Sequence, residues 1–176
     1  MLSRAAVLEA ALELVDAKGL AALNLRALAT RLGVSAMTPY SHFADKAELL
    51  SAMVGHALAP LSDRSAGASG WEEAILGAMH GLHSALEQHP GVVELIMVES
   101  HAQGLDDFRQ QFITILRGEG LSRTRAADVL RTLTSYILGY TLLSRLRREA
   151  SHDSFEDGLD MIMESLRREI SAQRPV

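Results

Sequence analysis

Apolar residues recur every three or four positions along most of the chain, which is the period of a helix with one buried face. Breaks at Gly, Pro or small polar residues divide this pattern into nine predicted helices. Their expected ranges are 4–18, 24–32, 35–43, 45–58, 71–89, 92–99, 105–117, 122–148 and 155–172. Four prolines and few β-branched runs also favour helices, so the sequence predicts an all-α fold.

Residues 60–70 interrupt the helical pattern with a run of small and polar residues. A run of this kind is typical of a linker. We therefore expect an N-terminal domain over residues 1–58 and a C-terminal helical bundle over residues 71–176. Helix 45–58 would link the two domains and could transmit a change in one domain to the other.

Residues 24–43 predict two short helices joined by a tight turn. Asn24 is a good N-cap for the first helix, because its side chain can accept a free backbone N–H of the first turn. Gly33 follows the last apolar residue of that helix, where a left-handed backbone costs least for glycine. Ser35 can cap the second helix, and the pair predicts a helix-turn-helix motif.

Two further motifs follow this pair of helices, Tyr40-x-His-Phe43 and Asp45-Lys46-x-x-Leu49-Leu50. Together with Leu25-Arg-Ala-Leu-Ala-x-x-Leu-Gly-Val-Ser35 they resemble the DNA-binding domain of the tetracycline-repressor (TetR) family. The close resemblance covers residues 4–56, and the rest of the chain agrees in length and helical pattern. Pro39 stands where the family often has an apolar, helix-compatible residue. Because Pro39 is near the start of its helix, we expect a tightened first turn and an intact motif.

The net charge of −5 does not exclude a nucleic-acid partner, because the acidic excess lies outside the motif. Basic and acidic residues balance over residues 1–60. Between Ala21 and Ala44 the only charged residues are Arg26 and Arg31, which are both positive. A dimer would present this basic patch twice. Of the two arginines, Arg31 is the better candidate for a salt bridge or a solvated side chain than for a DNA contact.

The second helix of such a motif enters the major groove with its N-terminal residues at the base edges. That end carries no Arg, Lys, Asn or Gln, so we expect modest specificity, with contributions from thymine methyl groups and DNA shape. The resemblance implies phosphate contacts at Tyr40, His42 and Lys46, whereas Phe43 is expected to pack in the core. The expected DNA-binding residues are Asn24, Arg26, Ser35, Ala36, Met37, Thr38, Tyr40, Ser41, His42 and Lys46.

The resemblance also implies a small-molecule cavity in the C-terminal bundle. A pocket needs a few polar groups that fix the ligand, so aromatic, histidine and large apolar residues of this domain are the candidates. They are Trp71, Met79, His83, Leu86, Ile96, His101, Phe108, Phe112, Tyr136 and Tyr140. An ordinary place in the core is the alternative for each of them. The polar-tipped candidates are the better ones, and a hydrophobic or aromatic ligand fits this set best.

The last two predicted helices carry more apolar surface than one short bundle can cover. The resemblance implies that they pair with the same helices of a second copy as a four-helix interface, and a purely intramolecular core is the alternative. The candidate interface residues are Leu130, Leu133, Ile137, Phe155, Leu159, Ile162, Met163 and Leu166.

Histidines raise the question of a metal site. His80 and His83 lie at i and i+3 with Glu87 one turn later, and His89 and His101 follow. The chain has no Cys, which structural zinc sites usually use, so we expect pocket-lining or surface histidines and no metal or other cofactor. The sequence shows no Ser-His-Asp order, phosphate-binding loop or paired carboxylates, so we expect no enzymatic activity.

No apolar stretch approaches the roughly 18 residues of a membrane span, and the start of the chain does not resemble a secretory signal. With no cysteine, the composition fits a reducing cytoplasm. We therefore expect a cytoplasmic, homodimeric repressor that binds a palindromic DNA operator and is released by a small molecule. The alternative is a helical protein-interaction module whose helix-turn-helix does not bind DNA. An activator is a further alternative, because the position of the operator decides whether such a protein represses or activates transcription.

Overall fold

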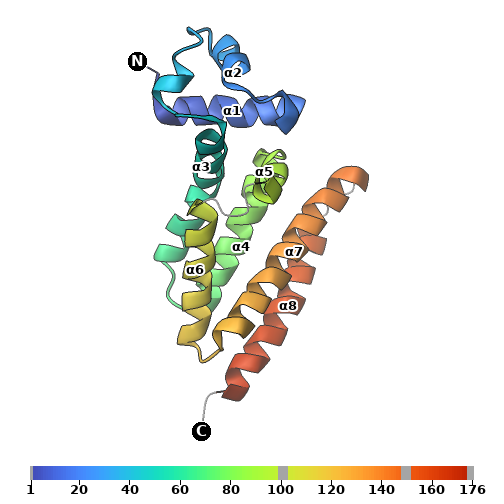
Figure 1. Cartoon of the computed structure of the whole chain (residues 1–176). Helices are drawn as coiled ribbons and strands as arrows, with labels where there is room; N and C mark the ends of the chain where they lie inside the picture. The colour runs from blue at the N-terminus through green and yellow to red at the C-terminus, as the bar shows by residue number, and fades with distance from the viewer. Residues whose placement is uncertain (1, 99–102, 148–151, 174–176) are drawn as a thin grey trace. The chain divides into compact units, whose positions relative to one another are not determined.

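The computed structural model describes residues 2–98, 103–147 and 152–173 (Figure 1). Over these residues the chain forms eight α-helices and two short 3₁₀ helices, which confirms the predicted all-α fold. The α-helices are α1 (Arg4–Lys18), α2 (Leu25–Leu32), α3 (Lys46–Ala66), α4 (Trp71–Gln88), α5 (Val92–Val98), α6 (Gln103–Gly118), α7 (Arg123–Arg147) and α8 (His152–Gln173). The 3₁₀ helices are η1 (Leu20–Ala22) and η2 (Pro39–Ser41).

Two expected boundaries differ from the structure. The predicted helix over residues 35–43 is not an α-helix but a set of turns around η2. The predicted linking helix does not end before residue 60, because α3 continues to Ala66. Pro60 lacks a backbone N–H and removes one helical hydrogen bond. One position later Leu61 is only 1% exposed, and its burial favours continuing the helix past the proline.

The contacts divide the chain into two compact units. Unit 1 consists of Met1–Pro60 together with Ser84–Asp107, and unit 2 consists of Leu61–His83 together with Phe108–Val176. Helices α3, α4 and α6 each pass from one unit into the other. The inserted segment, as we call Ser84–Asp107, therefore packs with the N-terminal helices although it lies in the predicted C-terminal domain.

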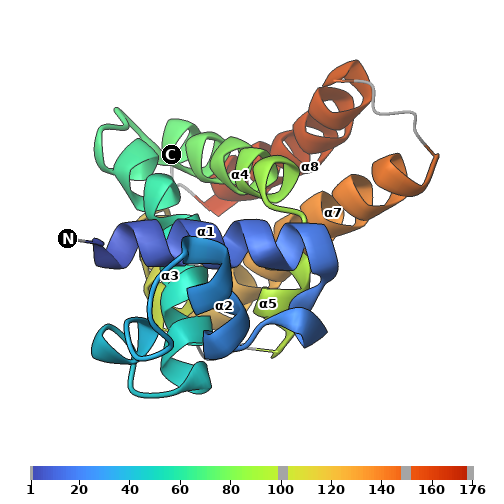
Figure 2. The ribbon, with the colours of Figure 1, turned by 90° about the horizontal axis from the view of Figure 1, so that it is seen from above.

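Unit 1 is built on α1, which lies across the start of α3 with α2 beside it (Figure 2). Ser3 caps α1 as its Oγ accepts a hydrogen bond from the Ala6 amide at 3.2 Å. The buried faces of these helices meet in one core, which receives Phe43 as predicted. Its large, fully buried side chains include Leu12, Leu23, Leu28, Phe43, Leu49, Met53, Leu86 and Leu95.

Unit 2 is organised around α8. Arg125 near the start of α7 binds Glu169 near the end of α8, and Tyr136 lies against Phe155, so the two helices are antiparallel. The hydrogen bond from Arg125 also lowers the pKa of the Glu169 carboxyl. On another side of α8, Arg167 pairs with Glu72 of α4. None of the helices in the described residues is both long and apolar enough to cross a lipid bilayer.

Candidate DNA-binding site

Helix α2 is fixed at both ends by its own sequence. Asn24 Oδ1 accepts a hydrogen bond from the Ala27 amide at 2.8 Å, which satisfies one of the free N–H groups of the first turn. At the other end Gly33 takes a left-handed conformation with φ 64°, and its N–H points back to the carbonyls of Ala29 and Thr30. The Val34 amide also donates to Ala29. Both caps were predicted, and they set the direction in which the chain leaves α2.

The recognition segment, residues 35–43, follows as a tight spiral. Its backbone bonds join residues three apart, from Thr38 to Ser35 at 3.0 Å and from Ser41 to Thr38 at 3.2 Å. Pro39 accounts for this geometry, because it has no N–H for the Ser35 carbonyl, which accepts from Thr38 instead. The expected tightening of the first turn thus extends through Ser41, and η2 stands in place of the predicted second α-helix.

This segment carries seven of the ten residues predicted to contact DNA. None of the ten predicted residues is buried. Met37 and Tyr40 are the most notable, with 71% and 51% of their surface exposed. Packing therefore does not account for Tyr40, whereas Phe43 is 1% exposed and belongs to the core.

Three hydroxyl groups of the segment are engaged locally. Ser35 Oγ and Thr38 Oγ1 lie 3.2 Å apart within hydrogen-bonding distance. Ser41 Oγ donates to the Thr38 carbonyl at 2.7 Å. The hydroxyl groups at the tip thus hold the spiral together, whereas the apolar side chain of Met37 is exposed. The sequence did not predict these local hydrogen bonds, because a Ser or Thr hydroxyl can bond either to nearby backbone and side-chain groups or to an external partner.

The basic side chains of this region divide into two groups. Arg31 pairs with Glu13 at 2.6 Å, as the sequence suggested, and Arg4 pairs with Glu48 while its guanidinium lies 4.6 Å from the centre of the Phe43 ring. Arg26 and Lys46 are exposed and form no ion pair with the described part of the chain. Their positive charges are therefore not neutralised by any acidic side chain that the structure describes.

Helix α3 begins with a capping box that fixes Lys46 at its first position. The Glu48 amide donates to Asp45 Oδ1 at 2.8 Å, and Glu48 Oε2 accepts from the Ala44 amide at 2.7 Å. An acid at the cap position followed by Glu three residues later, as in Asp45-x-x-Glu48, is typical of this cap. The recognition segment is therefore held between two capped helices. Lys46 lies at the start of the helix that follows it, and Arg26 lies in the first turn of α2, at the end away from the segment.

Comparison with known proteins agrees with this geometry. The model of bacterial regulatory proteins of the tetR family matches residues 7–53, and the model of the tetracyclin repressor-like C-terminal domain matches residues 65–154. The chain belongs to the TetR family of bacterial regulatory proteins. This is a family of transcriptional regulators and not a class of enzymes.

Individual TetR-family relatives are moderately similar. The HTH-type transcriptional repressor DrrR1 of Streptomyces coeruleorubidus is 25% identical over 150 residues, which are 82% of this chain and 54% of DrrR1, so the chain spans about half the length of that relative. The crystal structure of BioQ with its double-stranded DNA operator is 30% identical, with a TM-score of 0.69 over 94% of this chain and 98% of BioQ. A substituted form of TetR from Acinetobacter baumannii AYE in complex with minocycline is 25% identical, with a TM-score of 0.75 over 99% of this chain and 100% of that protein.

Unit 2 of this TetR-family chain gathers three of the predicted ligand residues around one ring. His83 stacks on Phe155 with ring centres 3.9 Å apart, and Tyr136 and Tyr140 lie 5.9 Å and 5.3 Å from the same ring. The Tyr136 hydroxyl donates to the Phe155 carbonyl at 2.9 Å, and burial raises the pKa of this phenol. The Tyr136 hydroxyl occupies the space that a side chain at Gly158 would need, a contact that sequence reasoning missed.

The other predicted ligand residues are dispersed. Met79, Phe108 and Phe112 are buried in unit 2, and Trp71 is partly exposed. Leu86 and Ile96 lie in the inserted segment and so belong to unit 1. His101 lies outside the described residues.

The predicted dimer residues are mostly committed to the core of unit 2. Seven of the eight are buried within the chain, and Ile162 alone among them keeps partial exposure. Their burial in a single copy means that a face for a second copy must use other side chains. Among the residues of α7 and α8 whose side chains the structure describes, the large exposed apolar ones are Leu142, Leu143 and Met161. A groove of about 330 Å³ lies between the same helices. It is lined by Arg125, Val129, Thr132, Met161, Ile162, Ser165, Leu166 and Glu169.

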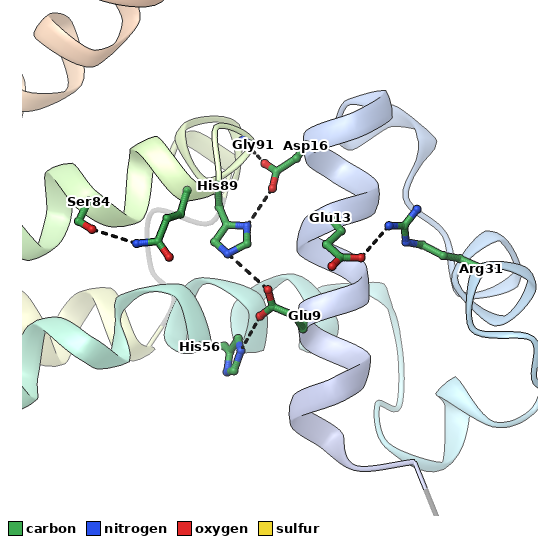
Figure 3. Close-up of polar contacts among 9 residues, drawn as sticks. Glu9, Glu13, Asp16, Arg31, His56, Ser84, His89 and Gly91 are labelled. Carbon is green, nitrogen blue, oxygen red and sulfur yellow. Dashed lines mark hydrogen bonds and ion pairs between the residues drawn. The ribbon is translucent and has the colours of Figure 1, made fainter. Parts of the chain in front are cut away.

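The histidines weighed as metal ligands have separate partners. His80 binds Glu156 at 3.0 Å, and His83 stacks on Phe155. His89 lies in the other unit, where it binds Asp16 (Figure 3). In the described ranges no three histidine, aspartate or glutamate side chains are grouped so that they could hold a metal ion.

Proposed function

We propose that this chain is a TetR-family transcriptional repressor that binds a palindromic DNA operator as a homodimer and releases it when a small molecule binds unit 2. The observation that carries the proposal is the exposed recognition segment between two capped helices, which also carry the cations Arg26 and Lys46 without an ion pair to the described residues. BioQ, a relative of the same family, has been crystallised with its operator.

The arrangement suggests a division of roles among the ten candidate residues. Met37 and Ala36 would meet base edges in the major groove, where apolar side chains contact thymine methyl groups. Tyr40, His42 and Lys46 would bind phosphates on one side, and Asn24 and Arg26 would bind phosphates from the start of α2. Ser35, Thr38 and Ser41 would mainly hold the spiral, because their hydroxyls bond within the segment.

The proposed effector site centres on His83, Tyr136 and Tyr140 around Phe155. These groups combine aromatic faces with three polar tips, which suits a hydrophobic or aromatic ligand with a few hydrogen-bonding groups. The minocycline complex of the Acinetobacter relative supports a small-molecule effector. Coupling of this kind changes operator affinity by roughly 5- to 150-fold. A regulator of this kind acts on DNA in the cytoplasm.

Selection of bound duplexes from a random pool, followed by sequencing, tests the proposal. We expect an enriched palindrome whose half-site centres are about 34–36 Å or a multiple apart. Lys46→Ala should weaken binding to all sequences and reduce the dependence of log K on log salt by about one unit. Lys18→Ala, an exposed charge at the end of α1, is the control and should leave binding unchanged. Failure to enrich any sequence at low salt would contradict DNA binding.

One observation favours a second function, a protein-interaction module. The tip of the recognition segment is apolar, since Met37 is 71% exposed and Ala36 is exposed beside it. Apolar anchors of this kind are common in protein interfaces. The salt dependence of duplex binding separates the two functions, because phosphate contacts release counterions and a protein interface on this tip would not.

A further inference from the structure

The inserted segment is fastened to α1 by a carboxylate that binds two of its residues. Asp16 Oδ2 accepts a hydrogen bond from His89 Nδ1 at 2.8 Å, and Asp16 Oδ1 accepts one from the Gly91 amide at 2.8 Å (Figure 3). The Asp16 and His89 side chains are each only 19% exposed. Partly buried, charge-assisted hydrogen bonds of this kind are about twice as strong as neutral ones.

In a second polar contact the carboxylate belongs to the inserted segment and the donor to the N-terminal part of the chain. The Leu20 amide of η1 donates to Glu94 Oε2 of α5 at 3.1 Å. The N-terminal part and the inserted segment thus each supply one carboxylate that accepts hydrogen bonds from the other. Leu20 lies in the connection that leads to Asn24, the cap of α2, so the inserted segment also fixes the path into the helix-turn-helix.

The backbones approach closely at the same place. A side chain at Gly91 would overlap the Val15 side chain, so this position has room for glycine alone. Beside it, Glu9 lies 3.6 Å from His89 Nε2 and 3.4 Å from His56 Nε2 of α3. His89 therefore lies between two acids of α1, and one of these acids also reaches α3 (Figure 3).

We propose that Asp16 is a positioning residue that locks the inserted segment onto α1 and makes this contact the place where the state of unit 2 reaches the recognition segment. The inference rests on the proposed function. Helices α4 and α6 run without a loop from the inserted segment into unit 2. A shift of either helix in unit 2 can therefore be passed to α1 through the bonds of Asp16, or it can be absorbed by breaking them.

Operator DNA itself can test this route, because thermodynamic coupling is reciprocal. If unit 2 acts on DNA binding through the inserted segment, then operator binding must act on the inserted segment. The experiment is amide hydrogen exchange of the full chain with and without the selected operator duplex. In the wild type we expect slower exchange at residues 24–46, and slower exchange by roughly fivefold or more at residues 91–98.

Variants of α1 separate this role from simple stabilisation. Asp16→Ala should keep the protection of residues 24–46 and lose the operator-linked protection of residues 91–98. Asp16→Asn should restore part of it, because its side-chain oxygen can still accept the Gly91 amide. Glu13→Ala is the matched control, since Glu13 is an exposed acid of the same helix whose partner is Arg31, and it should behave as the wild type. If Asp16→Ala does not fold, Glu94→Ala removes the reciprocal contact and should show the same loss.

Equal operator-linked protection of residues 91–98 in the wild type and in the folded Asp16→Ala or Glu94→Ala variant would overturn the inference. Protection confined to residues 24–46 in the wild type would overturn it as well, while leaving DNA binding intact. Absence of protection at residues 24–46 would overturn the proposed function and the inference together.

Discussion

At the scale of single residues, Met37 is the side chain that we propose to contact the DNA bases. The neighbouring hydroxyls of Ser35 and Thr38 bind each other, and the tip has no amide or guanidinium group. Base discrimination by this segment then depends on apolar contact, and the thymine methyl group is the apolar feature of the major groove.

This reasoning gives a test with matched changes on both molecules. Replacing the contacted thymine of the selected operator by deoxyuridine removes one methyl group. For the wild type we expect a loss of about 1 kcal/mol, or roughly fivefold in Kd, measured by fluorescence anisotropy. For Met37→Ala the same replacement should have little effect. The same exchange at a thymine outside the half-sites is the control, and an equal loss for both proteins would contradict the role of Met37.

Residue-scale predictions from the sequence succeeded where the chemistry is local. Asn24 and Gly33 were predicted as caps, because each acts on a backbone group within four positions. The stacking of Arg4 on Phe43 and the contact of Gly158 with Tyr136 were not predicted. Both join residues far apart in the chain, and periodicity carries no information about such pairs.

At the scale of elements, the departures trace to two prolines. Pro39 was expected to tighten one turn, but its missing N–H propagates into the 3₁₀ geometry of η2. Pro60 was expected to mark a linker, but the burial of Leu61 carries α3 onward. Propensity alone weighs the lost hydrogen bond and not the tertiary contacts that offset it.

The crossing of α3 and α6 within unit 1 offers a test of element packing. A Cβ atom at Gly104 would lie 2.7 Å from Gly55 Cα, whereas a Cβ atom at Gly55 would meet nothing within 4 Å. Gly104→Ala should therefore lower the free energy of unfolding by about 1–3 kcal/mol, since backbone atoms must move apart. Gly55→Ala should leave it unchanged or raise it by up to about 1 kcal/mol. Urea unfolding followed by circular dichroism measures both, and a reversed order of the two variants would contradict the crossing.

At the scale of the whole molecule, the proposed dimer depends on side chains that a single copy leaves exposed. The sequence assigned to a second copy eight residues of α7 and α8, and the chain itself buries seven of them. Periodicity identifies an apolar face without saying which neighbour covers it. Met161, beside the groove between α7 and α8, is the better test of the interface.

We expect Met161→Glu to weaken self-association without changing the stability of the monomer by more than about 0.5 kcal/mol, because the side chain is exposed. Sedimentation equilibrium measures the effect on the dimer constant. Met97→Glu is a closely matched control, since Met97 and Met161 are both 77% exposed and lie in different units. Equal dimer constants for Met161→Glu and the wild type would argue against an interface on this face.

The grouping of the inserted segment with the N-terminal helices has a consequence for protein engineering. A chimera that exchanges the first 60 residues between two family members would separate Asp16 from His89 and Gly91, and Leu20 from Glu94. The transplanted residues 1–60 would then pack against the inserted segment of the other family member instead of their own. The portable DNA-reading module of this chain is discontinuous, and a biosensor built from it should transplant Met1–Pro60 and Ser84–Asp107 together.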